Sequence, residues 1–157
     1  SSKTLQGGEL VMIGIAPKIN GYAGVVGDTL PVDGSYTPIQ NEYINYLKEA
    51  FRVTKAQLLP GKSGKEIDAP ARDYFAKHGL SKYLVCPFAH TIGLHEAEAP
   101  FFGPQSNDIL QEGMTVCVDI SFFGHPELNG VRIETGYEIS ASGPIPFSKK
   151  MDSLLLQ

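Results

Sequence analysis

Two alternating segments near the end of the chain, joined by a short loop, restrict its fold more than any other feature. In MTVCVDISFF (114–123) and GVRIETGYEIS (130–140), apolar side chains alternate with polar or small ones, which is typical of β-strands. The connection GHPELNG is short enough for the two strands to be antiparallel neighbours. We therefore expect a long β-hairpin that is too apolar to lie at the surface.

This hairpin predicts a pair of facing carboxylates. Cys117 and Asp119 share one face of the first strand, and Arg132 and Glu134 share one face of the second. If Asp119 and Glu134 face each other in a half-buried position, they repel unless a shared proton, a cation or a metal ion compensates the charge. The alternative is that each carboxylate is exposed or is paired with Arg132.

The remaining segments predict an α+β domain. ELVMIGIA (9–16) is apolar enough for a buried strand, and YAGVVGDTL (22–30) reads as its antiparallel partner. Residues 37–58 carry apolar side chains at helical spacing, and SGKE (63–66) is a capping box that begins a second helix. YLVCPF (83–88) reads as a further strand.

Composition and charge exclude several classes of protein. A chain of 157 residues, 42% hydrophobic and 19% charged, has the size and composition of one globular domain. Its net charge of −4 and the lack of a basic cluster argue against nucleic-acid binding. The apolar runs are too short for a membrane span, and SSKTLQGGEL lacks the pattern of a signal peptide. Cys86 and Cys117 lie in apolar runs and read as buried free thiols, so we expect a cytoplasmic protein.

The segment AHTIGLHEAEAP (89–100) gathers two histidines and two glutamates in a stretch that otherwise reads as buried. His90 and His95 are five positions apart, so they do not share a face of a helix, and in a strand they point in opposite directions unless Gly93 breaks the alternation. Each histidine alone is more readily explained as a structural residue than as a ligand.

Taken together, HTIGL…EAP, LQEGMTVCVDIS and GVRIE are similar to the three motifs of the pita-bread family, which includes aminopeptidase P, prolidase, methionine aminopeptidase and creatinase. The resemblance covers about residues 7–148. It implies an α+β fold with two similar halves around a curved antiparallel sheet. Residues 1–157 would form a single fragment of that domain, with a first-half hairpin over 7–34 and a complete second half over 37–148.

The resemblance also implies a set of site residues. His90 falls on the family's histidine ligand, Asp119 on its first glutamate ligand and Glu134 on its second. Glu98 falls on the glutamate of the H-E-x-P element, and His95 lies near the displaced histidine of that element. His90 would then be a ligand or general base, Asp119 and Glu134 ligands or an acid–base pair, and His95 and Glu98 contacts for substrate or proton transfer.

Two aspartates that complete the two-metal centre of the metallopeptidases are missing. The alignment with the family's first hairpin puts Gly14 and Val25 at these positions, and neither can bind a metal through its side chain. His90, Asp119 and Glu134 remain, which is enough for one divalent ion at most. Metal-free chemistry is the alternative, as in creatinase.

The resemblance implies a hydrolase that cleaves a C–N bond in a small peptide or amidino substrate. A non-catalytic family member that uses the pocket to bind a ligand or a protein is the alternative. The helices and leading strand of the first half are missing from residues 1–157, which would leave an open sheet edge. We therefore expect an N-terminal fragment or separate chain to complete the fold, and a homodimer.

Overall fold

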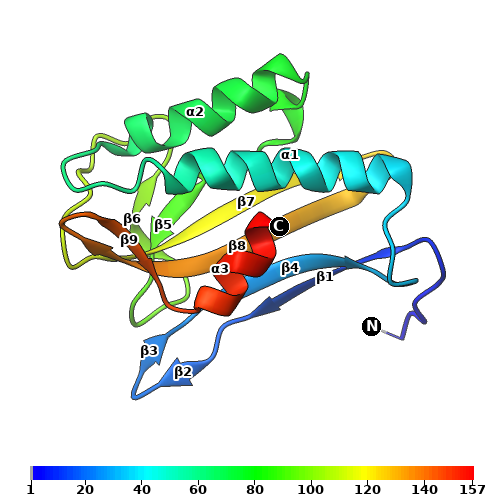
Figure 1. The fold of residues 1–157 in the computed structure, drawn as a ribbon, viewed down its shortest axis with the longest axis horizontal. Helices are drawn as coiled ribbons and strands as arrows, with labels where there is room; N and C mark the ends of the chain where they lie inside the picture. Colours follow the sequence, from blue (N-terminus) through cyan, green and yellow to red (C-terminus); the bar gives the residue numbers. More distant parts are fainter. Residues whose placement is uncertain (1) are drawn as a thin grey trace.

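The computed structural model describes residues 2–157, which form an antiparallel sheet with helices packed against one face and a small separate hairpin at one end (Figure 1). The elements in chain order are β1 (Leu10–Ile15), β2 (Lys18–Ile19), β3 (Tyr22–Ala23), β4 (Val26–Pro31), α1 (Pro38–Lys55), α2 (Gly64–Lys77), a 3₁₀-helix (Ser81–Tyr83), β5 (Ala89–Thr91), β6 (Glu98–Phe102), β7 (Thr115–His125), β8 (Asn129–Ser140), β9 (Gly143–Pro146) and α3 (Lys149–Leu156).

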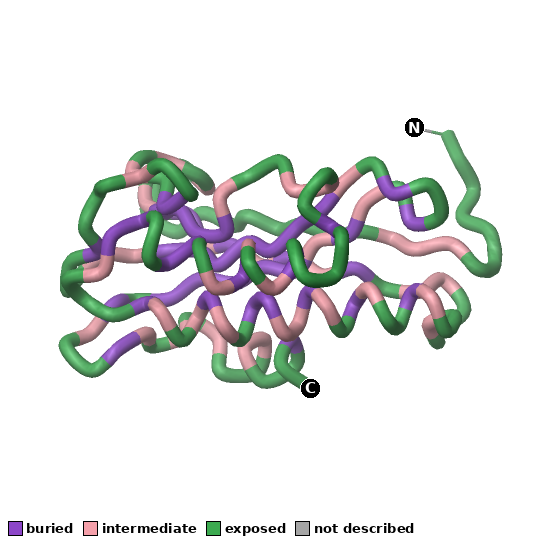
Figure 2. The backbone as a smooth tube through the Cα atoms, turned by 90° about the horizontal axis from the view of Figure 1, so that it is seen from above, coloured by how far each residue is buried: buried purple, intermediate pink, exposed green. Residues whose placement is uncertain are grey.

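The predicted long hairpin lies at the centre of the sheet. The strand order is β1-β4-β8-β7-β5-β6, with β9 paired to the other end of β8. β7 and β8 are antiparallel and are buried over most of their length, as the prediction required. Figure 2 shows buried stretches running along the strands, whereas buried positions recur at intervals along the helices.

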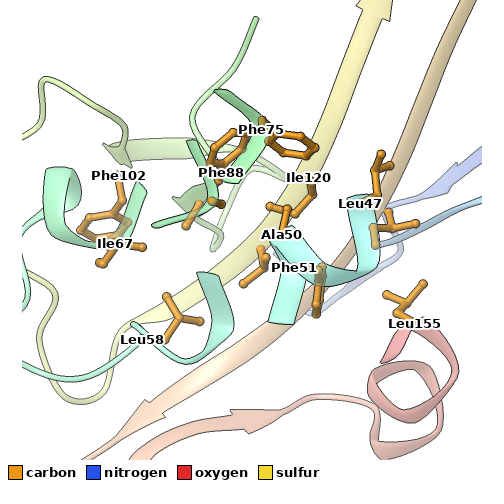
Figure 3. Packing of buried hydrophobic residues seen from close by; sticks show 14 of the residues in the cluster. Leu47, Ala50, Phe51, Leu58, Ile67, Phe75, Phe88, Phe102, Ile120 and Leu155 are labelled. Atoms are coloured by element: carbon orange, nitrogen blue, oxygen red, sulfur yellow. The ribbon is translucent and has the colours of Figure 1, made fainter. Parts of the chain in front are cut away.

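A layer of apolar side chains joins the helices to the sheet. Leu47 and Phe51 of α1, Phe75 of α2 and Ile120 of β7 are each fully buried, and Figure 3 shows them packed in one cluster. Leu47 and Phe51 are four residues apart in α1, at the helical spacing seen in the sequence, so the amphipathic pattern predicted within 37–58 is confirmed. Burial of such large side chains is the main favourable contribution to folding.

Side-chain caps begin both long helices. Thr37 precedes α1, where its Oγ1 accepts a hydrogen bond from the backbone N–H of Gln40 (3.3 Å). At α2, the carboxylate of Glu66 accepts a hydrogen bond from the backbone N–H of Ser63 (2.8 Å). These bonds satisfy donors that the first helical turn leaves without partners. The capping box predicted in SGKE is confirmed.

The first strand forms where predicted, but it is not buried. β1 pairs with β4 in antiparallel register and lies at the edge of the sheet. Met12, Ile13 and Ile15 are 46%, 41% and 55% exposed. The prediction of a buried strand over 9–16 was wrong because an apolar run does not reveal whether a strand has neighbours and cover in the folded protein.

The segment YLVCPF does not form the predicted strand. The 3₁₀-helix ends at Tyr83, and regular pairing starts only with β5 at Ala89. Pro87 has no N–H to donate to a strand ladder, which explains why pairing begins after it. Cys86 is consequently exposed, in contrast to the prediction, whereas Cys117 is buried and both thiols are free.

The arrangement confirms an α+β fold with an antiparallel sheet. The division into an incomplete first half and a complete second half stays a prediction. Among the helices of residues 2–157, none has the length and apolar character needed to cross a membrane.

Candidate active site

The candidate site lies on the face of the sheet opposite the helices. Val118 and Ile120 of β7 pack in the helix-facing core, so Cys117 and Asp119 point to the other face. The register pairs His90 of β5 with Cys117, and Asp119 with Glu134 of β8. Three neighbouring strands therefore bring these four side chains into adjacent positions.

The four side chains are shielded from water. Their exposed fractions are 5% for His90, 0% for Cys117, 7% for Asp119 and 1% for Glu134. Gly27 of β4 lies opposite Glu134, and a Cβ at Gly27 would come within 2.6 Å of the Glu134 side chain. The missing side chain at Gly27 thus gives Glu134 its space. A charge buried here must be balanced by groups within the site.

Arg132 connects the two carboxylates. Its Nε donates to Asp119 Oδ1 (3.0 Å), and its Nη2 donates to Asp119 Oδ2 (2.8 Å) and to Glu134 Oε2 (2.6 Å). The same Nη2 lies 3.8 Å from Glu96 Oε1, an acidic neighbour that the sequence did not single out. Bidentate arginine–carboxylate pairs are strong and directional. Pairing with Arg132, one of the predicted alternatives, is therefore what the structure shows.

The environment of Glu134 weakens its acidity. Burial raises the pKa of Glu134, and the negative charge of Asp119 contributes to the rise, while Arg132 opposes it; the pKa is raised to about 7. Near neutral pH the carboxyl group is therefore present in both protonation states. This is the property that a proton-transfer group requires.

The orientation of His90 leaves one ring nitrogen free. Nδ1 lies 3.0 Å from the carbonyl oxygen of Thr91. A carbonyl oxygen only accepts, so Nδ1 carries the proton in this bond and Nε2 of the neutral ring keeps a free lone pair. A backbone partner on one nitrogen is also the usual way in which a metal-binding histidine is oriented. His90 is thus prepared to act as a base or as a ligand.

The two positions that replace the family's aspartates lie beside the site. A Cβ at Gly14 would lie 3.7 Å from Glu134 Oε1, so this position faces the carboxylate. Val25 is buried and forms a small apolar cluster with Ile92 and Cys117. The residues present therefore do not fit a two-metal centre, because both oxygen ligands that would complete it are absent.

Two of the predicted site residues lie apart from this group. His95 is exposed, and its backbone N–H donates to Glu98 Oε2 (3.0 Å). The Glu98 carboxylate thereby holds the turn between β5 and β6, and a Cβ at Gly93 would clash with it. The structure does not bring either side chain into the cluster of His90, Asp119 and Glu134. Their roles in substrate contact or proton transfer stay predictions.

Cys117 belongs to the site, although the sequence was interpreted otherwise. One ligand atom each from His90, Cys117 and Glu134 lie within 4.8 Å of one another, and Cys117 Sγ lies 3.8 Å from Glu134 Oε2. Asp119 is not in this group. The signal was available, because Cys117 shares a strand face with Asp119, but its apolar neighbours suggested an inert buried thiol. These three residues could hold one metal ion.

The fold and this site define a class of protein, the pita-bread proteins, whose motif histidine and acidic residues lie on neighbouring strands of an antiparallel sheet. Residues 1–141 match the model of metallopeptidase family M24. The chain belongs to this family.

Relatives and solved structures agree with this assignment. The Xaa-Pro dipeptidase of Pyrococcus furiosus is 30% identical over 155 residues, which is 99% of this chain and 44% of that protein. The solved prolidase from Pyrococcus furiosus has a TM-score of 0.86 at 28% identity, covering 100% of this chain and 44% of that one. An Xaa-Pro dipeptidase from Bacillus anthracis has a TM-score of 0.88 at 30% identity, covering 95% and 41%. The predicted pita-bread fold is confirmed, and the chain spans less than half the length of these proteins.

Arg132→Leu should lower the free energy of unfolding by about 3–5 kcal/mol, because it leaves two buried carboxylates without their cation. Chemical denaturation at neutral pH measures this loss. Arg52→Leu is the matched control, since Arg52 pairs with Glu49 at the exposed surface of α1 and should have a small effect. Equal small effects of both substitutions would contradict a central role for Arg132.

Glu134→Gln should remove a pH dependence of stability. The unfolded carboxyl ionises near its ordinary pKa of 4.5, whereas the folded one stays protonated up to about 7. The native protein therefore loses stability as pH rises through this window, by up to about 3 kcal/mol, and a glutamine does not ionise.

Chemical denaturation without added metal, at pH values on either side of this window, measures how the free energy of unfolding changes with pH in the parent and in Glu134→Gln. Glu112→Gln is the control, because Glu112 is exposed and its substitution should leave the slope unchanged. A difference between Glu134→Gln and the parent that is constant across the window would refute the raised pKa.

Proposed function

We propose that this chain carries the catalytic face of a hydrolase that cleaves a C–N bond in a small peptide or amidino substrate, in a site with no metal or one metal ion. The observation that best supports this is the buried proximity of His90, with a free Nε2, to Glu134, whose pKa lies near neutral. Membership of a peptidase family and similarity to Xaa-Pro dipeptidases support peptides as the first substrates to test.

The side chains of the site have different roles in the proposed reaction. The free Nε2 of His90 can accept a proton from an attacking water. Glu134 can deliver a proton to the leaving nitrogen when it is protonated, because its pKa lies close to the working pH. Arg132 holds the Asp119 carboxylate in place through two hydrogen bonds, and the negative charge of Asp119 raises the pKa of Glu134 and so helps it to hold its proton.

A metal ion at this site would be held by residues of the His90, Cys117 and Glu134 cluster. It would supply Lewis-acid polarisation of the substrate's carbonyl or amidino group. The residues at positions 14 and 25 argue against a second ion, since they offer no oxygen ligand. The two-ion mechanism of clamping attacking and leaving oxygens is therefore not part of the proposal.

Non-catalytic binding is the second candidate function. It is favoured by the ion pairs of Arg132 with Asp119 and Glu134, because this cation already compensates part of the carboxylate charge that a metal or a substrate would otherwise have to balance. In that case the pocket would bind a ligand or protein without turnover. We place either function in the cytoplasm, since both cysteines are free thiols and suit a reducing compartment.

We further propose that polypeptide from the N-terminal half of the family fold, in the same protein or as a separate chain, covers the outer strands. An apolar groove of about 270 Å³ lies between these strands and α3. Ile13, Ile15, Leu30 and Leu154 line it and are 41%, 55%, 42% and 48% exposed. The free edge of β1 is also a template for pairing with another chain.

The isolated chain should therefore self-associate, and replacing Ile13 and Ile15 with lysine should suppress this, as should co-expression with the N-terminal half. Sedimentation velocity measures the species present. Val85→Lys is the control, because Val85 is 62% exposed but does not line the groove. A homodimer through another surface would persist in the lysine variants. A parent chain that is a well-behaved monomer by itself would overturn the proposal.

His90→Ala should lower the turnover of the cleaved substrate by about 10²–10⁴-fold while the circular dichroism spectrum stays unchanged. The assay uses the protein with its N-terminal half and a panel of Xaa-Pro dipeptides and amidino compounds. His78→Ala is the control, because His78 is exposed at the end of α2.

Turnover within a few-fold of the parent would remove His90 from the mechanism. If the parent cleaves no member of the panel while one of them raises its melting temperature, the non-catalytic candidate holds instead.

A further inference from the structure

We propose that the site binds one thiophilic divalent cation, such as zinc, through His90 Nε2, Cys117 Sγ and the Glu134 carboxylate. This differs from the set expected by resemblance, because Cys117 takes the place of Asp119. The proposal deepens the proposed function and rests on it only in taking this pocket as the functional site.

The strand pairing already assembles the three ligands. His90 lies opposite Cys117 across the β5–β7 pair, and Glu134 lies diagonally across the β7–β8 pair on the same face. Their ligand atoms lie within 4.8 Å of one another. Atoms around a tetrahedral zinc ion lie about 3.5 Å apart, given bonds of about 2.0–2.3 Å. On binding a metal, the three side chains would close this difference by rotation on their strands.

Asp119 is less available than Glu134 as a metal ligand. Both of its oxygens accept hydrogen bonds from Arg132, at 3.0 and 2.8 Å. Recruiting Asp119 to a metal would leave the guanidinium group of a half-buried arginine without its main partner, which is costly. The bond from Arg132 to Glu134 Oε2 is separate from this bidentate pair. A ligand set that uses Glu134 and leaves Asp119 out therefore preserves the pair of Arg132 and Asp119.

The charges of the proposed set balance. Metal binding forms bonds to the Cys117 sulfur and the Glu134 carboxylate. It releases to solvent the thiol proton and the proton that Glu134 carries when it is protonated, so one thiolate and one carboxylate neutralise a divalent cation. The neighbouring pair of Arg132 and Asp119 is neutral by itself. A site buried to this degree requires such a balance.

The donor set selects the class of metal. A sulfur, an imidazole nitrogen and a single carboxylate suit zinc or cobalt better than magnesium or calcium, which require several oxygen ligands. Val25 and Ile92 pack against Cys117, which adds apolar contacts where the family has an oxygen ligand. Three protein ligands leave one position open, as in catalytic rather than structural zinc sites.

Cobalt titration of the chelator-treated protein with its N-terminal half tests the proposal. One equivalent of Co²⁺ should produce a thiolate-to-cobalt charge-transfer band in the near ultraviolet, and Zn²⁺ should displace it. Cys117→Ser should abolish the band, whereas Cys86→Ser, the matched control at an exposed thiol, should keep it. Zinc affinity should fall more than about 100-fold in Cys117→Ser, beyond the 10–100-fold typical of residues outside the ligand set.

Circular dichroism verifies that each variant is folded, and Cys117→Ala provides a second variant if Cys117→Ser is not. Bound cobalt without the band, a band that depends on Cys86, or no binding at all would overturn the proposal. Turnover is assayed separately with and without chelator. Hydrolysis by a protein that binds no metal would reject this inference and leave the proposed function standing. Metal binding without turnover of any substrate would do the reverse.

Discussion

The antiparallel register between β7 and β8 is the constraint on which the rest of the structure depends. It places Asp119 opposite Glu134 and puts Arg132 within reach of both. A slip by one residue would turn these charges into the helix-facing core and turn Val118 and Ile120 out of it. The hydrophobic core therefore specifies the geometry of the polar site on the other face, because successive side chains of the same strands point alternately to the two faces of the sheet.

The site on that face has been reorganised around fewer negative charges than a two-metal centre needs. Gly14 and Val25 contribute none, and Arg132 compensates part of the charge of the two carboxylates that remain. Burial holds Glu134 near its protonation midpoint at neutral pH. The same features explain why a proton-transfer site, a one-metal site and a binding site are chemically close to one another here. They differ in whether the Glu134 carboxyl group, beside Arg132, carries a proton, binds a metal ion or has the arginine as its only partner.

The sequence predicted most of the fold because the periodic elements are also the buried ones. The helix predicted within 37–58 forms over Pro38–Lys55, and the capping box at Ser63 and the long hairpin form as expected. The errors fell on short apolar runs. Residues 9–16 became an exposed edge strand, and the segment around Cys86 stayed irregular before Pro87. Short apolar runs look alike whether or not other elements come to cover them.

For the site, the motifs located His90, Asp119 and Glu134, and the alternation of the strands correctly predicted which face the two carboxylates share. His95 and Glu98 were singled out by the motif but lie apart from this group, since the Glu98 carboxylate binds the backbone of its own turn. The sequence by itself determined the repeating faces of strands and helices, because these follow from local spacing. Only the tertiary structure decided that β1 is an edge and that Cys117 joins His90 and Glu134. These outcomes depend on which distant strands become neighbours, and local spacing does not encode that choice.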